Sequence, residues 1–202
     1  MLKTRRGQEQ HANVRKYAAE LVSLAPDVEL FKAIAPGVTR AAVLRDPVIT
    51  AGVSQFAVIQ SVSSSIGLDV RPVNLRDAGE IERVVTSFAR SPNGGLVVTA
   101  SALTLVHSAL ILTLAARHKL PAVYPRRSLV LAGGLISYGY DAVDQVRLAA
   151  GYVDRILRGA KPADLPVQAP TKFELAINMK TANALGLNVP TQMQLIADEV
   201  IE

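Results

Sequence analysis

The sequence predicts an α/β fold with a doubly wound, mainly parallel sheet. Short, mainly apolar runs alternate with segments of helical periodicity from residue 41 to residue 157, and this alternation is typical of strands joined by helices through right-handed crossovers. The short runs show little polar alternation, as expected of strands that helices cover on both faces. Hydrophobic residues make up 50% of the 202 residues, enough to bury a sizeable core.

The apolar runs place five strands along the chain. They are expected at residues 41–44, 68–73, 96–99, 122–124 and 135–138. Because the strands are parallel and covered on both faces, their central side chains form the core. That core is expected to contain Val43, Val97, Val98, Val123 and Ile136.

Helix signals lie between the strands. Helices are expected over residues 14–22, 29–35, 50–66, 77–88, 103–118 and 141–157. Asp77 and Glu80 resemble a capping box, and Asp141 is a candidate N-cap for the last of these helices. Residues 103–118 are apolar nearly all round, so we expect that helix to be buried. In the helix after Asp141, one face carries Val143, Val146, Ala150, Val153 and Leu157.

Residues 161–187 predict an extended strap followed by a closing helix. Three prolines between residues 162 and 170 prevent a continuous helix over the first part. Asn178 is suited to cap a short helix, and Gly186 is suited to end it.

This run closely resembles the tail of the bacterial ABC-transporter substrate-binding proteins of the tryptophan-binding-like type. The resemblance continues back through residues 132–139 and 116–125 to residues 34–44, and it covers most of the chain. It implies the type I periplasmic-binding fold, in which two α/β lobes enclose a ligand cleft. For this chain it implies the second lobe together with a remnant of the first.

The resemblance also implies a division of the chain. Residues 1–36 are expected to form the remnant of the first lobe and an entry helix, residues 37–133 the second-lobe α/β domain, and residues 134–202 a return segment, a crossing strap and closing helices. Compared with the family, we expect the chain to lack amino-terminal strands and to carry an internal deletion near Val28 and Glu29. Two helical segments abut there with no strand between them.

The function implied by the resemblance is that of the solute-binding component of an ABC importer. Such a protein captures a small organic solute, for example an amino acid, without converting it, and docks on a membrane permease. Relatives are periplasmic. Here Lys3, Arg5 and Arg6 lead into polar residues instead of the apolar segment of a signal peptide, so we expect the chain as written to stay in the cytoplasm. No run reaches the roughly 20 apolar residues of a membrane span, so no membrane insertion is expected.

Ligand-binding residues are expected in the loops that follow the strands, because parallel strands bring their carboxyl ends to one edge of the sheet. The candidates are Arg45, Asp46, Ser101, Tyr124, Tyr138 and Asp141. Of these, we expect Asp46, Ser101, Tyr124 and Tyr138 to gather at one edge.

Most of these candidates also have a purely structural interpretation. Arg45 and Asp46 either bind the charged ends of a zwitterion or form a solvated turn. Ser101 either donates to a ligand carboxylate or caps a helix. Tyr138 either contacts the ligand or packs in the core. Asp141 either caps its helix or pairs with an ammonium group.

Catalytic and cofactor sites are not expected. His11, His107 and His118 have no His, Cys or Glu at metal-ligand spacing, and the chain contains no cysteine. Neither Gly-Gly pair forms a phosphate-binding loop, and no nucleophile motif is present. We therefore expect no metal, no cofactor and no enzymatic activity.

Two other function classes are open as alternatives. A small α/β enzyme or receiver-like module would use Asp46, but no acidic cluster or matching base accompanies it. The ligand-sensing domain of a transcriptional regulator would share the fold, but residues 1–25 hold one helix, too little for a helix-turn-helix. The net charge of +5 comes from scattered basic residues, so nucleic-acid binding is not expected.

Overall fold

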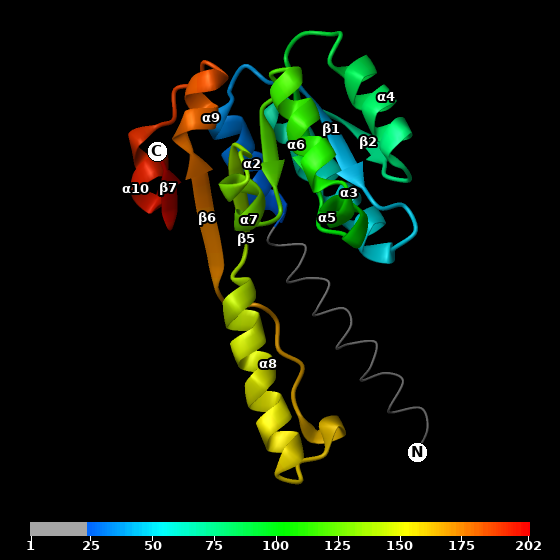
Figure 1. Cartoon of the computed structure of the whole chain (residues 1–202), viewed down its shortest axis with the longest axis vertical. Helices are drawn as coiled ribbons and strands as arrows, with labels where there is room; N and C mark the ends of the chain where they lie inside the picture. The colour runs from blue at the N-terminus through cyan, green and yellow to red at the C-terminus, as the bar shows by residue number, and fades with distance from the viewer. Residues whose placement is uncertain (1–23) are drawn as a thin grey trace. The chain divides into compact units, whose positions relative to one another are not determined.

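The computed structural model describes residues 24–202 of the chain (Figure 1). The basic start at Lys3, the residue His11 and the helix expected over residues 14–22 lie outside the described residues. The chain divides into two compact units. In its described part, the larger unit comprises residues 24–139 and 174–202, and the smaller unit comprises residues 140–173.

A seven-stranded sheet organises the larger unit. In spatial order its strands are β2 (Asp69–Asn74), β1 (Arg40–Arg45), β3 (Gly94–Val98), β4 (Ala122–Tyr124), β5 (Ile136–Tyr140), β6 (Phe173–Asn178) and β7 (Glu199–Ile201). The first five strands in this order pair in parallel, and β7 pairs in parallel with β6. The backbone N–H of Asn178 donates to the carbonyl of Leu135 at 2.9 Å, so the end of β6 lies beside the start of β5. The sheet is therefore mixed but mainly parallel.

The α/β fold class and the five expected strands are confirmed, whereas β6 and β7 were not anticipated. β6 occupies the second part of the expected strap, at residues 173–178, and finds its hydrogen-bonding partners in distant segments. The closing helix is confirmed as α9 (Met179–Ala184). The Asn178 side chain caps it by accepting from the N–H of Thr181 at 3.0 Å, and Gly186 follows with a φ of +69°.

Helices cover both faces of the sheet and create two hydrophobic cores. One core, here called the α2-side core, takes side chains from α2 (Leu24–Ile34), α3 (Thr50–Ser63), α9 and α10 (Thr191–Ile196). The α4-side core takes side chains from α4 (Ala78–Phe88), α6 (Ser108–Arg117) and α7 (Arg127–Leu131). Successive residues of a strand alternate between them, since Val43 lies in the first core and Leu44 in the second. All five expected core residues are buried: Val43, Val97, Val98, Val123 and Ile136.

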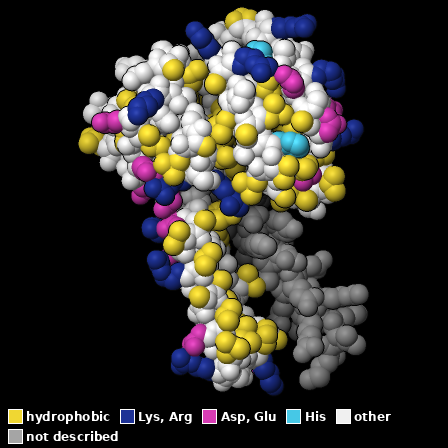
Figure 2. Space-filling model, in the orientation of Figure 1, with side chains coloured by type: hydrophobic (Ala, Val, Ile, Leu, Met, Phe, Trp, Pro, Cys, Tyr) yellow, Lys and Arg dark blue, Asp and Glu magenta, His cyan; other side chains and the backbone are white. Residues whose placement is uncertain are grey.

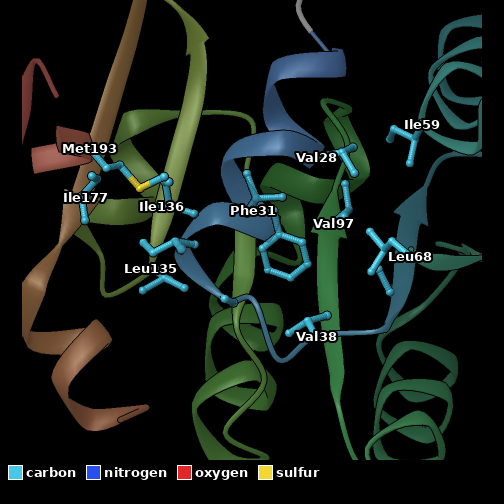
Figure 3. Close-up of a cluster of buried hydrophobic side chains, with 14 of the residues drawn as sticks. Val28, Phe31, Val38, Ile59, Leu68, Val97, Leu135, Ile136, Ile177 and Met193 are labelled. Atoms are coloured by element: carbon cyan, nitrogen blue, oxygen red, sulfur yellow. The ribbon is translucent and has the colours of Figure 1, made fainter. Parts of the chain in front are cut away.

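Phe31 anchors α2 to the sheet. Its side chain is fully buried, and Figure 3 shows its ring between Val97 of β3 and Leu135, the residue before β5. Gly95 makes this approach possible, because a Cβ at that position would lie 2.4 Å from Cζ of Phe31. The glycine therefore fixes how closely α2 rests on the sheet.

The helix expected to begin at Glu29 begins earlier. Pro26 and Glu29 both lie within α2, which is continuous from Leu24 to Ile34. Proline is tolerated in the first turn of a helix because its missing N–H has no intrahelical acceptor there. The proposed deletion site near Val28 thus falls inside one continuous helix.

The helix expected over residues 103–118 is not continuous. His107, with φ −98° and ψ 13°, separates α5 (Ala102–Val106) from α6. Leu105 and Val106 are 42% and 74% exposed, so the expectation of complete burial is wrong for this segment. The other helices expected within the described residues are present. Asp77 accepts from the N–H of Glu80 at 2.8 Å at the start of α4, and α3 continues into the short 3-10 helix η1 (Ser64–Ile66).

The smaller unit consists of α8 (Ala142–Leu157), the 3-10 helix η2 (Pro162–Asp164) and an irregular return over residues 165–172. Figure 1 shows α8 as a single helix followed by this return segment. No residue of α8 is buried, and Figure 2 shows hydrophobic side chains at the surface of this helix. The two ends of the unit meet, because the N–H of Asp141 donates to the carbonyl of Lys172 at 3.0 Å.

Candidate functional site

The carboxyl ends of four parallel strands lie at one edge of the sheet. The register pairs Leu44 with Val98, Val97 with Val123, and Tyr124 with Ser137. The loops that follow β1 and β3 therefore begin at the same edge as the ends of β4 and β5. The structure brings Asp46, Ser101, Tyr124 and Tyr138 to this edge, but their side chains have different surroundings.

Arg45 and Asp46 are both held by neighbouring groups of the larger unit. The Nε of Arg45 donates to Oδ1 of Asn74 at 3.1 Å, and its guanidinium lies 4.9 Å from the centroid of the Phe56 ring. Asp46 is buried, and its Oδ1 accepts from the N–H of Val48 at 2.9 Å. These contacts shape the loop after β1, while the role of the two residues toward a ligand stays a prediction.

Ser101 caps the helix that follows β3. Its Oγ accepts from the N–H of Thr104 at 3.0 Å and lies 3.0 Å from the Thr104 hydroxyl. That hydroxyl in turn donates to the carbonyl of Thr99 at 2.8 Å. The capping interpretation therefore describes what Ser101 does in this structure, and carboxylate binding by Ser101 stays a prediction.

Tyr124 lies in the α4-side core instead of in a ligand pocket. Its side chain is 2% exposed, and burial raises the pKa of its hydroxyl well above the ordinary value. Gly134 makes room for the ring, because a Cβ there would lie 2.7 Å from it. The side chain points into the core because Tyr124 is the last residue of β4 and alternates with Val123, which belongs to the α2-side core. This position does not favour contact with a solute.

Tyr138 lines a cavity that is open to solvent, since Ile196 of its lining is 67% exposed, whereas Tyr124 borders only a hollow of about 20 Å³. The cavity has a volume of about 420 Å³ and belongs entirely to the larger unit. Its lining consists of Glu29, Leu30, Ala33, Tyr138, Leu175, Ile196 and Asp198. One wall is α2, and the other is formed by β5, β6 and the segment that leads into β7.

Backbone pairing brings the carboxylate of Asp198 to the cavity. The N–H of Asp198 donates to the carbonyl of Leu175 at 2.9 Å, and Oδ2 of Asp198 accepts from the N–H of Leu175 at 2.8 Å. Glu29 supplies a second carboxylate from α2, and no Lys, Arg or His is among the lining residues. The cavity thus combines aliphatic walls, one tyrosine and two acidic groups, the composition of a small-molecule site of this size.

Sequence reasoning missed both acidic residues of this cavity. Asp198 reaches it only because β6 and β7 join the sheet, and neither strand was anticipated. Glu29 was placed at the start of a separate helix, whereas it lies inside α2. An alternating apolar pattern at residues 173–177 is the one local signal from which β6 could have been found.

Asp141 acts as the N-cap of α8 and belongs to the smaller unit. Its Oδ1 accepts from the N–H groups of Val143 and Asp144 at 2.9 and 3.1 Å, and its Oδ2 accepts from Nζ of Lys172 at 2.7 Å. The hydrogen bond from Lys172, followed by that from the Asp144 N–H, holds the pKa of Asp141 below its ordinary value of 3.8. The carboxylate already has several donors in this structure.

Replacing Asp141 with asparagine is expected to destabilise the smaller unit at neutral pH. A carboxyl group whose pKa is lowered by folding stabilises the folded state above its ordinary pKa, here 3.8, and that contribution is lost as the pH falls through the folded pKa. The difference between wild type and Asp141→Asn should therefore be present at pH 7 and shrink below pH 3.8. Hydrogen exchange of the α8 amides across this range checks the prediction. Asp154→Asn, in the last turn of α8 where the carboxylate pairs with Arg158 on the surface, is the control, and an equal effect of both variants would contradict the prediction.

The described residues contain no group of three or more acidic or histidine side chains arranged to hold a metal ion. Within residues 24–202, none of the helices combines the length and the hydropathy needed to cross a bilayer.

A family model described as ABC transporter substrate binding protein matches residues 17–201. The chain belongs to this family. The match confirms the resemblance seen in the sequence, and it does not favour an enzyme, a receiver-like module or a transcriptional regulator. The family is a solute-binding, non-catalytic one. No curated protein sequence matches the chain significantly.

Solved structures of similar proteins agree with the membership in this family. An ABC domain in complex with L-Trp from Streptococcus pneumonia is 25% identical, with a TM-score of 0.82 over 89% of this chain and 60% of that chain. A conserved domain protein from Vibrio cholerae is 23% identical, with a TM-score of 0.80 over 88% and 60%. A ligand-free, open substrate-binding protein with adhesive properties from Clostridium difficile is 18% identical, with a TM-score of 0.61 over 87% and 58%. This member of the family thus spans about 60% of the length of the structures that it matches.

Proposed function

We propose that this chain is the solute-binding component of an ABC importer and that it captures a small organic solute, such as an amino acid, without converting it. The observation that carries the proposal is the cavity at Tyr138, which lies in a fold matched by the family over residues 17–201. The bound L-Trp of the Streptococcus pneumonia structure supports an amino acid as the solute class. An ABC permease is the partner that follows from the family, whose members are normally periplasmic or extracellular.

The cavity is suited to a solute with an apolar body and an ammonium group. Leu30, Leu175 and Ile196 provide aliphatic contact area, and the ring of Tyr138 adds an aromatic wall. The carboxylates of Glu29 and Asp198 attract a positive charge. Binding by these groups requires no bond to be made or broken, so the proposal includes no catalytic step.

Nuclear magnetic resonance titration of the 202-residue chain with a panel of L-amino acids tests the proposal. Because the chain spans 60% of the matched structure, we expect only part of a complete binding site and therefore a dissociation constant weaker than about 1 µM. Chemical shifts of the cavity residues should change with saturation. If no amino acid of the panel binds, or if the chemical shifts change only on other surfaces, the proposed function is overturned for this cavity.

The variant Tyr138→Ala is expected to weaken binding of the best amino acid by about 1 to 3 kcal/mol, as for a lost aromatic contact at a pocket wall. Tyr138→Phe keeps the ring and should retain most of the affinity. Tyr140→Ala, which removes a tyrosine that does not line the cavity, is the matched control. If Tyr138→Ala unfolds the chain or leaves binding unchanged, Tyr138 belongs to the core and not to the site.

A further inference from the structure

The cavity at Tyr138 is acidic, although the chain as a whole is basic. Glu29 and Asp198 belong to its lining, and no Lys, Arg or His is among the described lining residues. The chain has a formal net charge of +5 at pH 7, so the acidity is a local property of the cavity. Two carboxylates at one cavity attract cations and repel anions.

Neither acid of the cavity forms an ion pair within residues 24–202, because the salt bridges in this part of the chain involve other acidic side chains. Oδ2 of Asp198 accepts from the N–H of Leu175 at 2.8 Å, but a backbone N–H brings no formal charge. For Glu29, the described residues contribute no hydrogen bond and no ion pair. The described part of the chain therefore leaves the negative charge of the cavity without a neutralising partner.

The two acids reach the cavity from different walls. Glu29 belongs to α2, and Asp198 belongs to the segment that leads into β7. The aliphatic side chains of Leu30, Leu175 and Ile196 line the same space. A solute whose apolar body contacts these side chains thus carries its ammonium group into acidic surroundings.

A free amino acid carries a second charge that this lining does not accommodate. Its α-carboxylate is attached to the same carbon atom as the ammonium group, so an ammonium placed near Glu29 or Asp198 brings the carboxylate close to the same acids. Carboxylates are recognised best by the paired N–H donors of Arg, and the described lining contains no Arg. An amine whose carboxylate is converted to an amide keeps the attraction and loses the repulsion.

We propose that the cavity prefers primary amines without a free carboxylate, such as the amide of an apolar amino acid, over the corresponding amino acid. The proposal rests on the proposed function, since it narrows the solute class of the same cavity. Glu29 and Asp198 are exposed, so water and salt screen their charges and the preference is moderate. At low salt, the amide is expected to bind at least about threefold more tightly than the amino acid.

Nuclear magnetic resonance titration of the full chain with L-leucine and with L-leucinamide tests the preference. At about pH 6.5 both solutes carry the ammonium group, because α-amino groups have pKa values of about 7.7 to 8.0 or higher. N-acetyl-L-leucinamide lacks the ammonium group and should bind more weakly than L-leucinamide. If L-leucine binds as tightly as L-leucinamide, or if the acetylated amide does, this inference is overturned while the proposed function stands. If neither solute binds and the amino acid panel is also negative, the proposed function itself fails.

Two isosteric substitutions show whether the acids cause the preference. Glu29→Gln and Asp198→Asn each remove one charge, and Asp198→Asn keeps a side-chain oxygen that accepts from the N–H of Leu175. Each should lower the ratio of the two affinities, and the double variant should bring it close to one. Glu174→Gln removes an acid of β6 that does not line the cavity and is the matched control. A ratio that is unchanged in the double variant, or that falls equally in Glu174→Gln, would overturn the proposal. Circular dichroism reports whether each variant remains folded.

Discussion

Replacing Phe31 with alanine is expected to lower the free energy of unfolding by about 3 to 5 kcal/mol. The ring is fully buried in the α2-side core and lies between Val97 and Leu135 (Figure 3). Removing it leaves a cavity beneath α2, and Gly95 has no side chain with which to fill it. Urea denaturation followed by circular dichroism measures the loss. Leu148→Ala, on the surface of α8, is the control and should change the stability little.

The contact between Phe31 and Gly95 predicts strong coupling between substitutions at the two positions. In the wild type, Gly95→Ala forces a Cβ to within 2.4 Å of Cζ of Phe31 and 3.0 Å of the Pro121 carbonyl oxygen, and should destabilise the fold. After Phe31→Ala, the first collision is absent and the same substitution should cost less, by at least about 1 kcal/mol. Additive effects of the two substitutions would show that the ring does not rest on Gly95 as described.

Replacing Asn178 with alanine is expected to lower the free energy of unfolding by about 1 to 3 kcal/mol, the sum of a lost N-cap and a lost buried hydrogen bond. The side chain is 5% exposed and performs two tasks. Its Oδ1 caps α9, and its Nδ2 donates to the carbonyl of Val130 at 3.2 Å. Alanine removes both hydrogen bonds, so α9 loses its cap and the Val130 carbonyl keeps only one of its two donors, the N–H of Gly133 at 3.0 Å.

Asn178→Asp separates the two tasks because it keeps the acceptor for α9 and removes the donor to Val130. Its loss should be smaller than that of Asn178→Ala but still measurable, at about 0.5 to 1.5 kcal/mol. Thermal and chemical unfolding of both variants checks the order. Equal stability of Asn178→Ala and the wild type would mean that water replaces both hydrogen bonds and that the side chain does not stabilise the junction of β6 and α9.

The sequence was sufficient to predict those structural features that depend on residues close together in the chain. The apolar runs of β1 and β3 predicted buried strands, and Asp77, Asp141 and Asn178 predicted helix starts, since a cap and its helix are adjacent in the chain. β7 has only three residues, and it is a strand because β6 supplies its partners. Such partners are not visible in the local pattern.

The candidate site shows the same limit. Chain order and parallel topology placed four of the predicted residues at one edge, but the surroundings of each side chain depend on which face of the sheet it points to. Tyr124 and Tyr138 both come at strand ends, yet one lies in the α4-side core and the other lines the cavity. The sequence alone could not predict Asp198 as a cavity residue, because its place beside Leu175 requires pairing between segments that are more than 20 residues apart.

The meeting of Asp141 and Lys172 sets the order in which the sheet is completed. β5 ends at Tyr140, but β6, its partner in the finished sheet, begins only at Phe173. Pairing them closes a loop of roughly 30 residues, which costs more chain entropy than the shorter connection between β4 and β5. Until this loop closes, β5 is an unpaired edge that carries Ile136, a side chain destined for the core. A partly folded chain that lacks this pairing is therefore the form most exposed to wrong strand pairing.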